Sequence, residues 1–247
     1  RSFRHHSPLR LVMTKDSASG RHRRVATIGV YLARGADHQS MRYYPIFLDL
    51  KDKPVVVVGG GAVAERKVRV LLESDADVTV IAPSVTPTIR EWAENNQITL
   101  NERSYVPGDL AGAFCVYAAT DDHAVNVSVS QEAEQRRMLC NVVDVPALCN
   151  FIVPAIVDRG DLCIAVSTSG ASPALAKKLK RELSEQFGPE WTALSELLAR
   201  LRPEIKRRHP EESPRNEVLD RMLEAGVLEM LKEGRTEEAE ETAWQCI

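Results

Sequence analysis

VVVVGGGAVA, residues 55–64, is the stretch that decides the fold of this chain. Four consecutive valines at 55–58 are typical of a strand buried inside a parallel sheet. Three glycines follow at once, and apolar residues then recur at helical spacing over 63–74. A strand that passes through a glycine turn into a helix is how a Rossmann-type βαβ unit begins.

Strands and helices alternate beyond the glycine turn. Their order predicts an α/β fold in which a doubly wound parallel sheet carries helices on both faces. We assign residues 41–153 to this Rossmann-type domain. Further strands are expected at 78–81, 98–100, 113–119 and 139–143, and helices at 63–74, 86–95 and 123–137.

A smaller α+β unit is predicted after the parallel sheet. Residues 151–157 and 162–167 flank a short turn, which indicates an antiparallel hairpin. A helix is expected over 172–187, because Pro173 then stands in its first turn, where proline is tolerated. We assign residues 154–188 to this smaller unit.

The two ends of the chain differ from both of these units. Residues 189–247 are rich in charge and predict a helical C-terminal domain, with breaks near Pro203 and Pro210. Residues 1–40 mix Arg, His and Ser with few large apolar side chains. That composition predicts a mostly disordered tail or an upstream extension.

Composition narrows the classes of partner. The formal net charge is -3, whereas nucleic-acid-binding proteins generally carry an excess of Lys and Arg. No uninterrupted apolar run approaches the roughly 20 residues that span a bilayer. Five cysteines without CxxC spacing predict reduced thiols and a cytoplasmic location. We therefore expect no nucleic acid, no membrane and no bound metal.

The glycine turn matches the G-x-G-x-x-A form of the dinucleotide fingerprint. Gly59 permits the tight turn, and Gly61 leaves room for a pyrophosphate to approach the backbone. The N-terminus of the following helix offers free N–H groups to the phosphates. Further cofactor contacts are expected beside the turn and at the carboxyl ends of the neighbouring strands, namely Ala62, Val63, Pro83, Ser84, Ala119, Thr120 and Asn141.

One element of the fingerprint is absent. The second strand ends without the Asp or Glu that usually accepts the ribose hydroxyls. Backbone groups or Ser84 are the alternatives for holding the ribose. No Arg or Lys stands close by in sequence to bind a 2′-phosphate, which favours NAD over NADP.

Five motifs in this chain resemble, in the same order, those of one protein family. They are PIF at 45–47, GGGAVAERK at 59–67, AATDD at 118–122, NVVD at 141–144 and STSGASP at 167–173. Together they are similar to the precorrin-2 dehydrogenase and sirohydrochlorin ferrochelatase family, including the N-terminal module of sirohaem synthase. The resemblance is good over 43–208. Nothing downstream resembles the methyltransferase half of that enzyme, which favours the stand-alone form.

The resemblance implies an activity and a catalytic residue. It implies NAD-dependent oxidation of precorrin-2 to sirohydrochlorin by a homodimer that interlocks through residues 154–188. Some members also insert ferrous iron into sirohydrochlorin, so ferrous ion is a candidate substrate and this second activity stays open. Asp144 corresponds to the family's essential aspartate. Its position at the end of a strand is consistent with a place in the active site, because ligands of such folds bind at the carboxyl ends of the strands. The carboxylate also suits the reaction, since hydride transfer leaves a proton that a carboxylate can remove.

Substrate contacts are predicted in the STSGASP motif. Ser167, Thr168 and Ser169 precede a helix N-terminus, where hydroxyls and free N–H groups favour anions. The resemblance implies a substrate with many carboxylates, and Lys177 on the next helix adds positive charge. A solvated basic face explains that lysine equally well.

Two alternatives stay open. Asp121 and Asp122 can act in the site or can cap the helix that follows them. A non-catalytic NAD-sensing module would share the glycine loop and the sheet, but such modules do not predict the NVVD and STSGASP motifs together.

Overall fold

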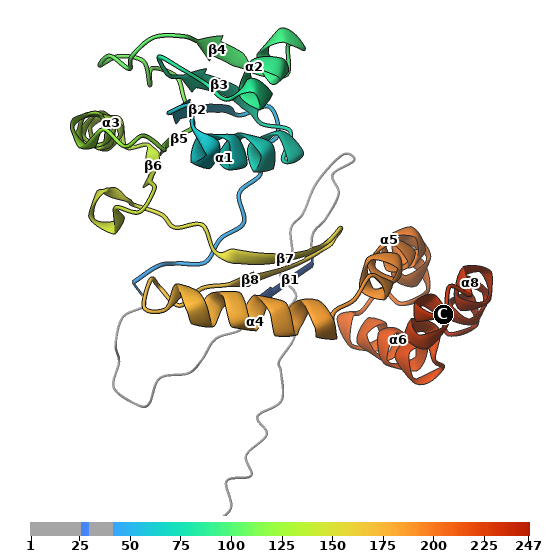
Figure 1. Cartoon of the computed structure of the whole chain (residues 1–247). Helices are drawn as coiled ribbons and strands as arrows, with labels where there is room; N and C mark the ends of the chain where they lie inside the picture. Colours follow the sequence, from blue (N-terminus) through green and yellow to red (C-terminus); the bar gives the residue numbers. More distant parts are fainter. Residues whose placement is uncertain (1–25, 30–41) are drawn as a thin grey trace, which may run out of the picture. The chain divides into compact units, whose positions relative to one another are not determined.

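The structure is a computed structural model that describes residues 42–247 and the backbone of a short strand, β1 (Ala26–Gly29). The chain divides into two compact units (Figure 1). One is Ser40–Val153, and the other contains Pro154–Ile247 together with β1. The tail predicted for 1–40 otherwise lies outside the described residues.

Five parallel strands form the sheet of the first unit, in the order β4-β3-β2-β5-β6 (Figure 1). Central β2 pairs with β3 on one side and β5 on the other, so that Val58 lies between Ile81 and Ala118. The strands are β2 (Pro54–Val58), β3 (Asp77–Ile81), β4 (Thr99–Asn101), β5 (Cys115–Ala118) and β6 (Leu139–Val142). Their carboxyl ends share the edge at which the glycine turn leaves β2.

The valines of β2 divide the core of this unit into two layers. Val55 and Val57 pack in the same layer as α1 (Ala62–Glu73) and α2 (Pro87–Glu94). Val56 and Val58 point to the other face and pack with α3 (His123–Gln135). All four side chains are buried because successive residues of a strand point to opposite faces, each covered by helices. This arrangement confirms the predicted doubly wound α/β fold.

Helix starts in this unit follow local signals. Thr86 caps α2 by accepting a hydrogen bond from the N–H of Ile89 at 3.3 Å. Asp122 caps α3 by accepting from the N–H of Ala124 at 2.8 Å, so the capping role of Asp122 is confirmed. Helix α1 has no side-chain cap, because its N-cap residue is Gly61.

The second unit contains a three-stranded sheet and one long helix beside it. Strands β7 (Ala155–Arg159) and β8 (Leu162–Val166) form the predicted antiparallel hairpin. Strand β1 adds to the other edge of β8 in parallel. Helix α4 (Pro173–Gln186) packs against this sheet.

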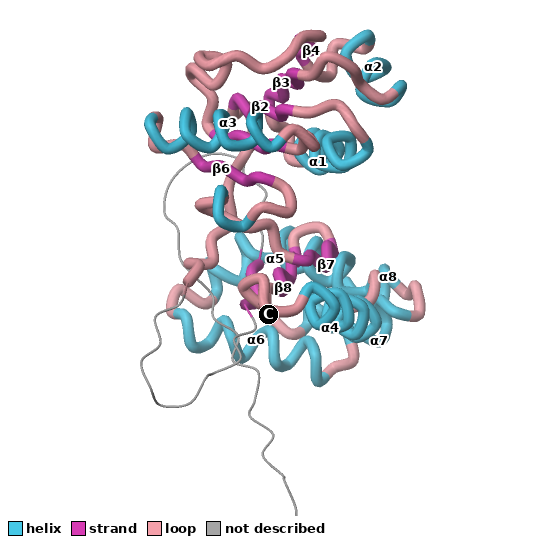
Figure 2. Tube along the Cα trace, turned by 60° about the vertical axis from the view of Figure 1, so that its left-hand side comes forward, coloured by secondary structure: helices cyan, strands magenta, loops and turns pink. Residues whose placement is uncertain are grey.

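Helices dominate the C-terminal part of this unit (Figure 2). The predicted break near Pro210 is confirmed, whereas the break at Pro203 is wrong, because α5 continues through that residue. Pro203 lies on the exposed side of the helix, where water can satisfy the carbonyl that loses its N–H partner. The helices are α5 (Glu190–Arg208), α6 (Glu212–Glu224), α7 (Val227–Lys232) and α8 (Thr236–Gln245).

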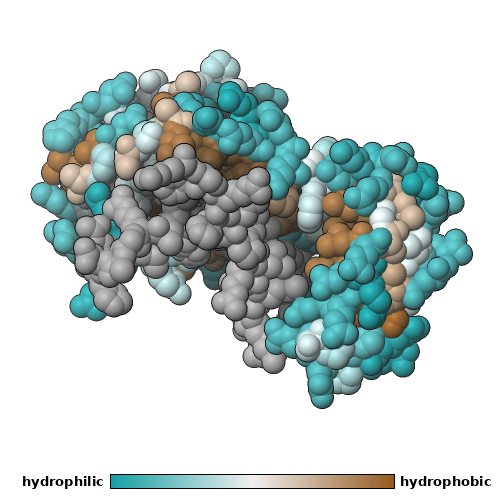
Figure 3. All heavy atoms as spheres, turned by 90° about the horizontal axis from the view of Figure 1, so that it is seen from below, coloured by the Kyte–Doolittle hydropathy of each residue, from teal (hydrophilic) through white to brown (hydrophobic). Residues whose placement is uncertain are grey.

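Polar side chains cover most of the described surface on the face shown in Figure 3. Within the described residues, no helix combines the length and the apolar character that crossing a membrane requires.

Candidate active site

Two of the three consecutive glycines are required by the fold itself. Gly59 has φ +125°, and a Cβ there would lie 2.2 Å from the carbonyl oxygen of Ala119. A Cβ on Gly60 would lie 2.0 Å from the carbonyl oxygen of Ser84. Gly60 carries no signal of its own in the sequence, because the fingerprint allows any residue there. Only the neighbouring loop shows why it must be glycine.

Gly61 is different, because a Cβ there would meet nothing within 4 Å. The protein therefore has no steric need for glycine at this position. The space beside Gly61 lies at the uncapped N-terminus of α1, whose first N–H groups and dipole favour an anion. An open cradle at this point fits the pyrophosphate of a dinucleotide.

A cavity of about 430 Å³ extends from the glycine turn. Eight of the predicted cofactor residues line it, namely Gly59, Gly61, Ala62, Val63, Pro83, Ser84, Ala119 and Thr120. Ser104 and Tyr105 also line it. Neither residue could be predicted from the sequence, because both belong to an irregular segment after β4 that carries no motif.

A second cavity, of about 250 Å³, adjoins the first. The two share Val63, Ala119, Thr120 and Asp121. Asp144 lines the second cavity, two residues after the end of β6, and is exposed with φ +59°. The structure thus brings the predicted catalytic carboxylate and the predicted dinucleotide site to the same edge of the sheet.

Asn141 lines neither of these cavities. It is 9% exposed, and its Nδ2 donates a hydrogen bond to the carbonyl oxygen of Phe151 at 3.1 Å. The amide therefore ties β6 to the segment that follows it. Contact between Asn141 and the cofactor stays a prediction.

Lys67 on α1 is a charged neighbour of Asp144 that the sequence analysis did not single out. Burial and the adjacent Arg66 lower the pKa of Lys67, while the Asp144 carboxylate and the Cys149 thiol act in the opposite direction. Its Nζ also lies 5.7 Å from the centroid of the Tyr117 ring. Lys67 places positive charge close to the proposed proton acceptor.

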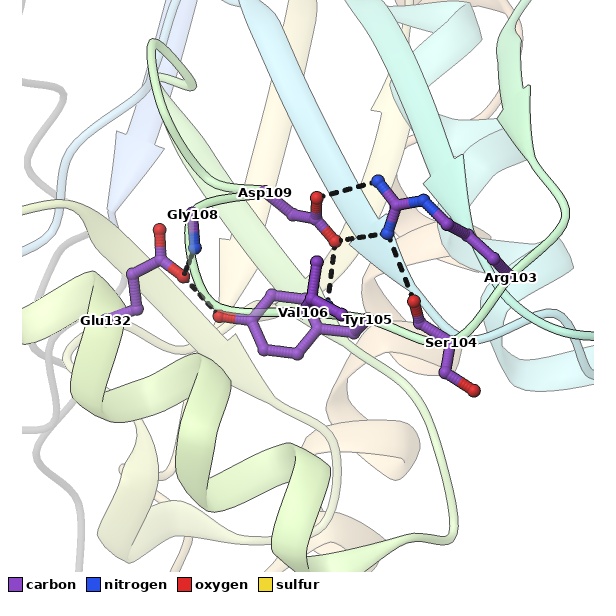
Figure 4. A network of polar contacts seen from close by, with 7 residues as sticks. All are labelled: Arg103, Ser104, Tyr105, Val106, Gly108, Asp109 and Glu132. Atoms are coloured by element: carbon purple, nitrogen blue, oxygen red, sulfur yellow. Dashed lines mark hydrogen bonds and ion pairs between the residues drawn. The ribbon is translucent and has the colours of Figure 1, made fainter.

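Two carboxylates hold the irregular segment between β4 and β5 (Figure 4). Glu132 on α3 accepts hydrogen bonds from the hydroxyl of Tyr105 and, at 2.8 Å, from the N–H of Gly108. Asp109 accepts two hydrogen bonds from the guanidinium of Arg103, at 2.7 and 2.8 Å. Because Tyr105 lines the first cavity, this network holds part of the cavity wall in place.

Glu132→Gln is expected to lower the free energy of unfolding at pH 7 by about 1–3 kcal/mol. The Gln side chain cannot accept hydrogen bonds from all three donors that Glu132 serves, which are Tyr105, Gly108 and Arg136. Burial raises the pKa of Glu132, but hydrogen bonds from Tyr105, Gly108 and Arg136 outweigh it and leave the pKa below its ordinary value. The stability that Glu132 contributes is therefore present above about pH 4.5 and is lost as the pH falls through the lowered pKa.

Urea unfolding of both proteins between about pH 3 and about pH 7 measures this effect, because this range includes the ordinary Glu pKa of 4.5. The stability difference between wild type and Glu132→Gln should shrink at the acid end. A difference that stays constant over this range would contradict the role of the Glu132 charge.

The predicted substrate residues belong to the second unit, in the turn before α4. Ser167 accepts from the N–H of Ser169 at 3.0 Å, and Thr168 Oγ1 accepts from the N–H of Ser172 at 3.1 Å. These hydroxyl oxygens therefore shape the turn. Lys177 lies exposed on α4. Substrate binding by these residues stays a prediction.

Family models match three successive parts of the chain. An NAD(P)-binding model matches residues 46–155, and a model described as sirohaem biosynthesis protein central matches 159–186. The sirohaem synthase dimerisation region matches 190–245. This third match lies C-terminal to 154–188, the region expected to interlock.

Individual relatives give the same assignment. Siroheme synthases of Methylococcus capsulatus and Nitrosococcus oceani are 42% and 38% identical over 200 residues, which is 81% of this chain. The chain spans 42% and 43% of their lengths. The solved structure of SirC, precorrin-2 dehydrogenase, is 32% identical with a TM-score of 0.66, and the match covers 83% of this chain and 98% of that chain.

The parallel sheet, the glycine turn and the matching NAD(P)-binding model define a dinucleotide-binding protein of the Rossmann type. The matching NAD(P)-binding model and the similarity to precorrin-2 dehydrogenase confirm the predicted cofactor, NAD. The chain belongs to the precorrin-2 dehydrogenase family of sirohaem biosynthesis, as its motifs predicted.

Proposed function

We propose that this chain oxidises precorrin-2 to sirohydrochlorin with NAD. The observation that carries the proposal is the pair of adjoining cavities, one containing the glycine turn and the other lined by Asp144. Cofactor and proton acceptor then converge at the carboxyl edge of the sheet. Family membership supports the substrate and the direction of the reaction.

The oxidation removes a hydride and a proton from the substrate, and the products are sirohydrochlorin, NADH and a proton. Bound NAD would accept the hydride. The cradle at Gly61 holds the pyrophosphate, and Ser84 with nearby backbone groups holds the adenosine ribose. Asp144 removes the proton, and its exposure allows the proton to pass on to water.

Lys67 supports this role of Asp144 by its charge. The Lys67 ammonium and the Asp144 carboxylate interact electrostatically, which places a positive charge near the proposed proton acceptor.

The finer assignments of partners belong to the same proposal. A homodimer is supported by the match to a dimerisation region at 190–245. A cytoplasmic location is supported by the free thiols of the described cysteines. Substrate carboxylates bind at the turn of Ser167, Thr168 and Ser169, with Lys177 adding charge, and ferrous ion is the substrate of a second, chelating activity.

The test is to incubate the purified chain with precorrin-2 and NAD and to follow sirohydrochlorin and NADH together. We expect the two products in equal amounts. Binding of NAD without either product would reject the dehydrogenase and favour an NAD-sensing module. Chelation needs a separate assay with sirohydrochlorin and ferrous ion but no NAD, in which failure to form sirohaem rejects the second activity alone.

A further inference from the structure

Asn126 on α3 carries a buried oxygen that has no hydrogen-bond partner among the described residues. The residue is 5% exposed. Its Nδ2 donates to the carbonyl oxygen of Thr120 at 2.9 Å. Exchanging the nitrogen and oxygen would set two acceptors against each other, so this bond defines the orientation of the amide. Buried acceptors without a donor are rare in folded proteins and call for an explanation.

The position of Asn126 indicates what the missing donor is. Asn126 lines the cavity of Asp144, together with Val63 and Thr120, which also line the cavity of the glycine turn. A dinucleotide with its pyrophosphate at Gly61 and its adenosine towards Ser84 extends its other half into the second cavity. That half is the nicotinamide riboside, which carries ribose hydroxyls and a carboxamide N–H as donors.

We propose that Asn126 Oδ1 accepts a hydrogen bond from the nicotinamide riboside of NAD. The inference rests on the proposed function, because it takes NAD to lie along both cavities. The oxygen itself is screened from solvent, so binding includes a small rotation about the Cβ–Cγ bond that brings it to the cavity wall. This torsion is soft in Asn.

Three ligands of increasing length test the proposal on the full chain. ADP contains the adenosine and pyrophosphate, ADP-ribose adds the second ribose, and NADH adds the nicotinamide. We expect Asn126→Ala to leave the Kd for ADP unchanged and to raise the Kd for NADH about tenfold, the effect of one lost hydrogen bond. If ADP-ribose also loses affinity, a ribose hydroxyl is the donor; if only NADH does, the carboxamide is.

Ser130→Ala is the matched control. Ser130 lies one turn further along α3, and its hydroxyl donates to the carbonyl oxygen of Leu148 at 3.1 Å without lining either cavity. All three affinities should stay at their wild-type values in this variant. Thermal unfolding of each protein checks that the variant is folded. If Asn126→Ala is unfolded, the same three titrations are made with Asn126→Leu, whose side chain fills a similar volume.

Two outcomes would overturn the proposal. An equal loss of affinity for ADP, ADP-ribose and NADH would make Asn126 a structural residue, and an unchanged Kd for NADH would remove the contact altogether. None of the titrations contains precorrin-2. If the chain binds NADH but does not oxidise precorrin-2, the proposed function is rejected. The affinity measurements on Asn126→Ala then still decide whether Asn126 contacts the nicotinamide riboside.

Discussion

Asp144→Asn is expected to reduce kcat for precorrin-2 oxidation about a thousandfold while leaving the Kd for NADH nearly unchanged. The amide cannot remove a proton, but Asn tolerates the left-handed backbone conformation that Asp144 adopts, with φ +59°. Asp144→Ala should also abolish turnover, although alanine adds backbone strain at this position. Steady-state kinetics and fluorescence titration with NADH measure the two effects separately.

Asp75→Asn is the control for this substitution. Asp75 is an exposed aspartate that also has a left-handed backbone, with φ +55°, but it precedes β3 at the opposite edge of the sheet. This variant should keep wild-type kcat. A large loss of NADH affinity in Asp144→Asn would make Asp144 a structural residue, and retained turnover would assign the proton to another group.

Gly59→Ala and Gly61→Ala are expected to fail in opposite ways, although only Gly60 separates the two positions. At Gly59 the added Cβ collides with the backbone oxygen of Ala119, and φ of +125° is strained for any other residue. We expect a loss of about 4 kcal/mol or more in the free energy of unfolding, or no folded protein. At Gly61 the Cβ meets no protein atom, so the fold should survive while the added methyl group occupies the pyrophosphate cradle.

The Gly61→Ala variant should therefore unfold at nearly the wild-type urea concentration and bind NADH at least about tenfold more weakly, a loss of about 1.4 kcal/mol in binding. Urea unfolding followed by NADH titration separates the two effects. Wild-type affinity in this variant would mean that the pyrophosphate lies elsewhere, and a stable Gly59→Ala protein would contradict the close approach to Ala119.

Most of the architecture could be predicted because its signals are local. The four valines of β2 indicate a strand buried on both faces, and the glycine turn that follows predicts both the crossover helix and the nucleotide site. The hairpin of β7 and β8 follows from two apolar runs around a short turn. The predicted helix break at Pro203 was wrong for a physical reason. The local rule that proline breaks a helix does not take into account that water can satisfy the freed carbonyl on an exposed face.

Motif and family likeness were enough to predict that Asp144 and eight predicted cofactor residues meet at one edge, because parallel strands bring their carboxyl ends together. Neither the motifs nor the family likeness predicted Ser104, Tyr105 or Asn126 as part of the cavities. Ser104 and Tyr105 come from an irregular segment whose place depends on tertiary contacts, among them the hydrogen bond from the Tyr105 hydroxyl to Glu132 on α3. Asn126 looks like an ordinary helix residue until its neighbours are known.

What the amino-acid order alone decided is the fold class, the fingerprint and the family, since all three depend on residues adjacent in the chain. Tertiary structure decided which glycines the fold requires and which one leaves open space, because that depends on whether Ala119, Ser84 or no protein atom faces the missing side chain. It also decided that the buried side-chain oxygen of Asn126 has no donor within the described part of the chain, since hydrogen bonding there depends on atoms brought together by folding.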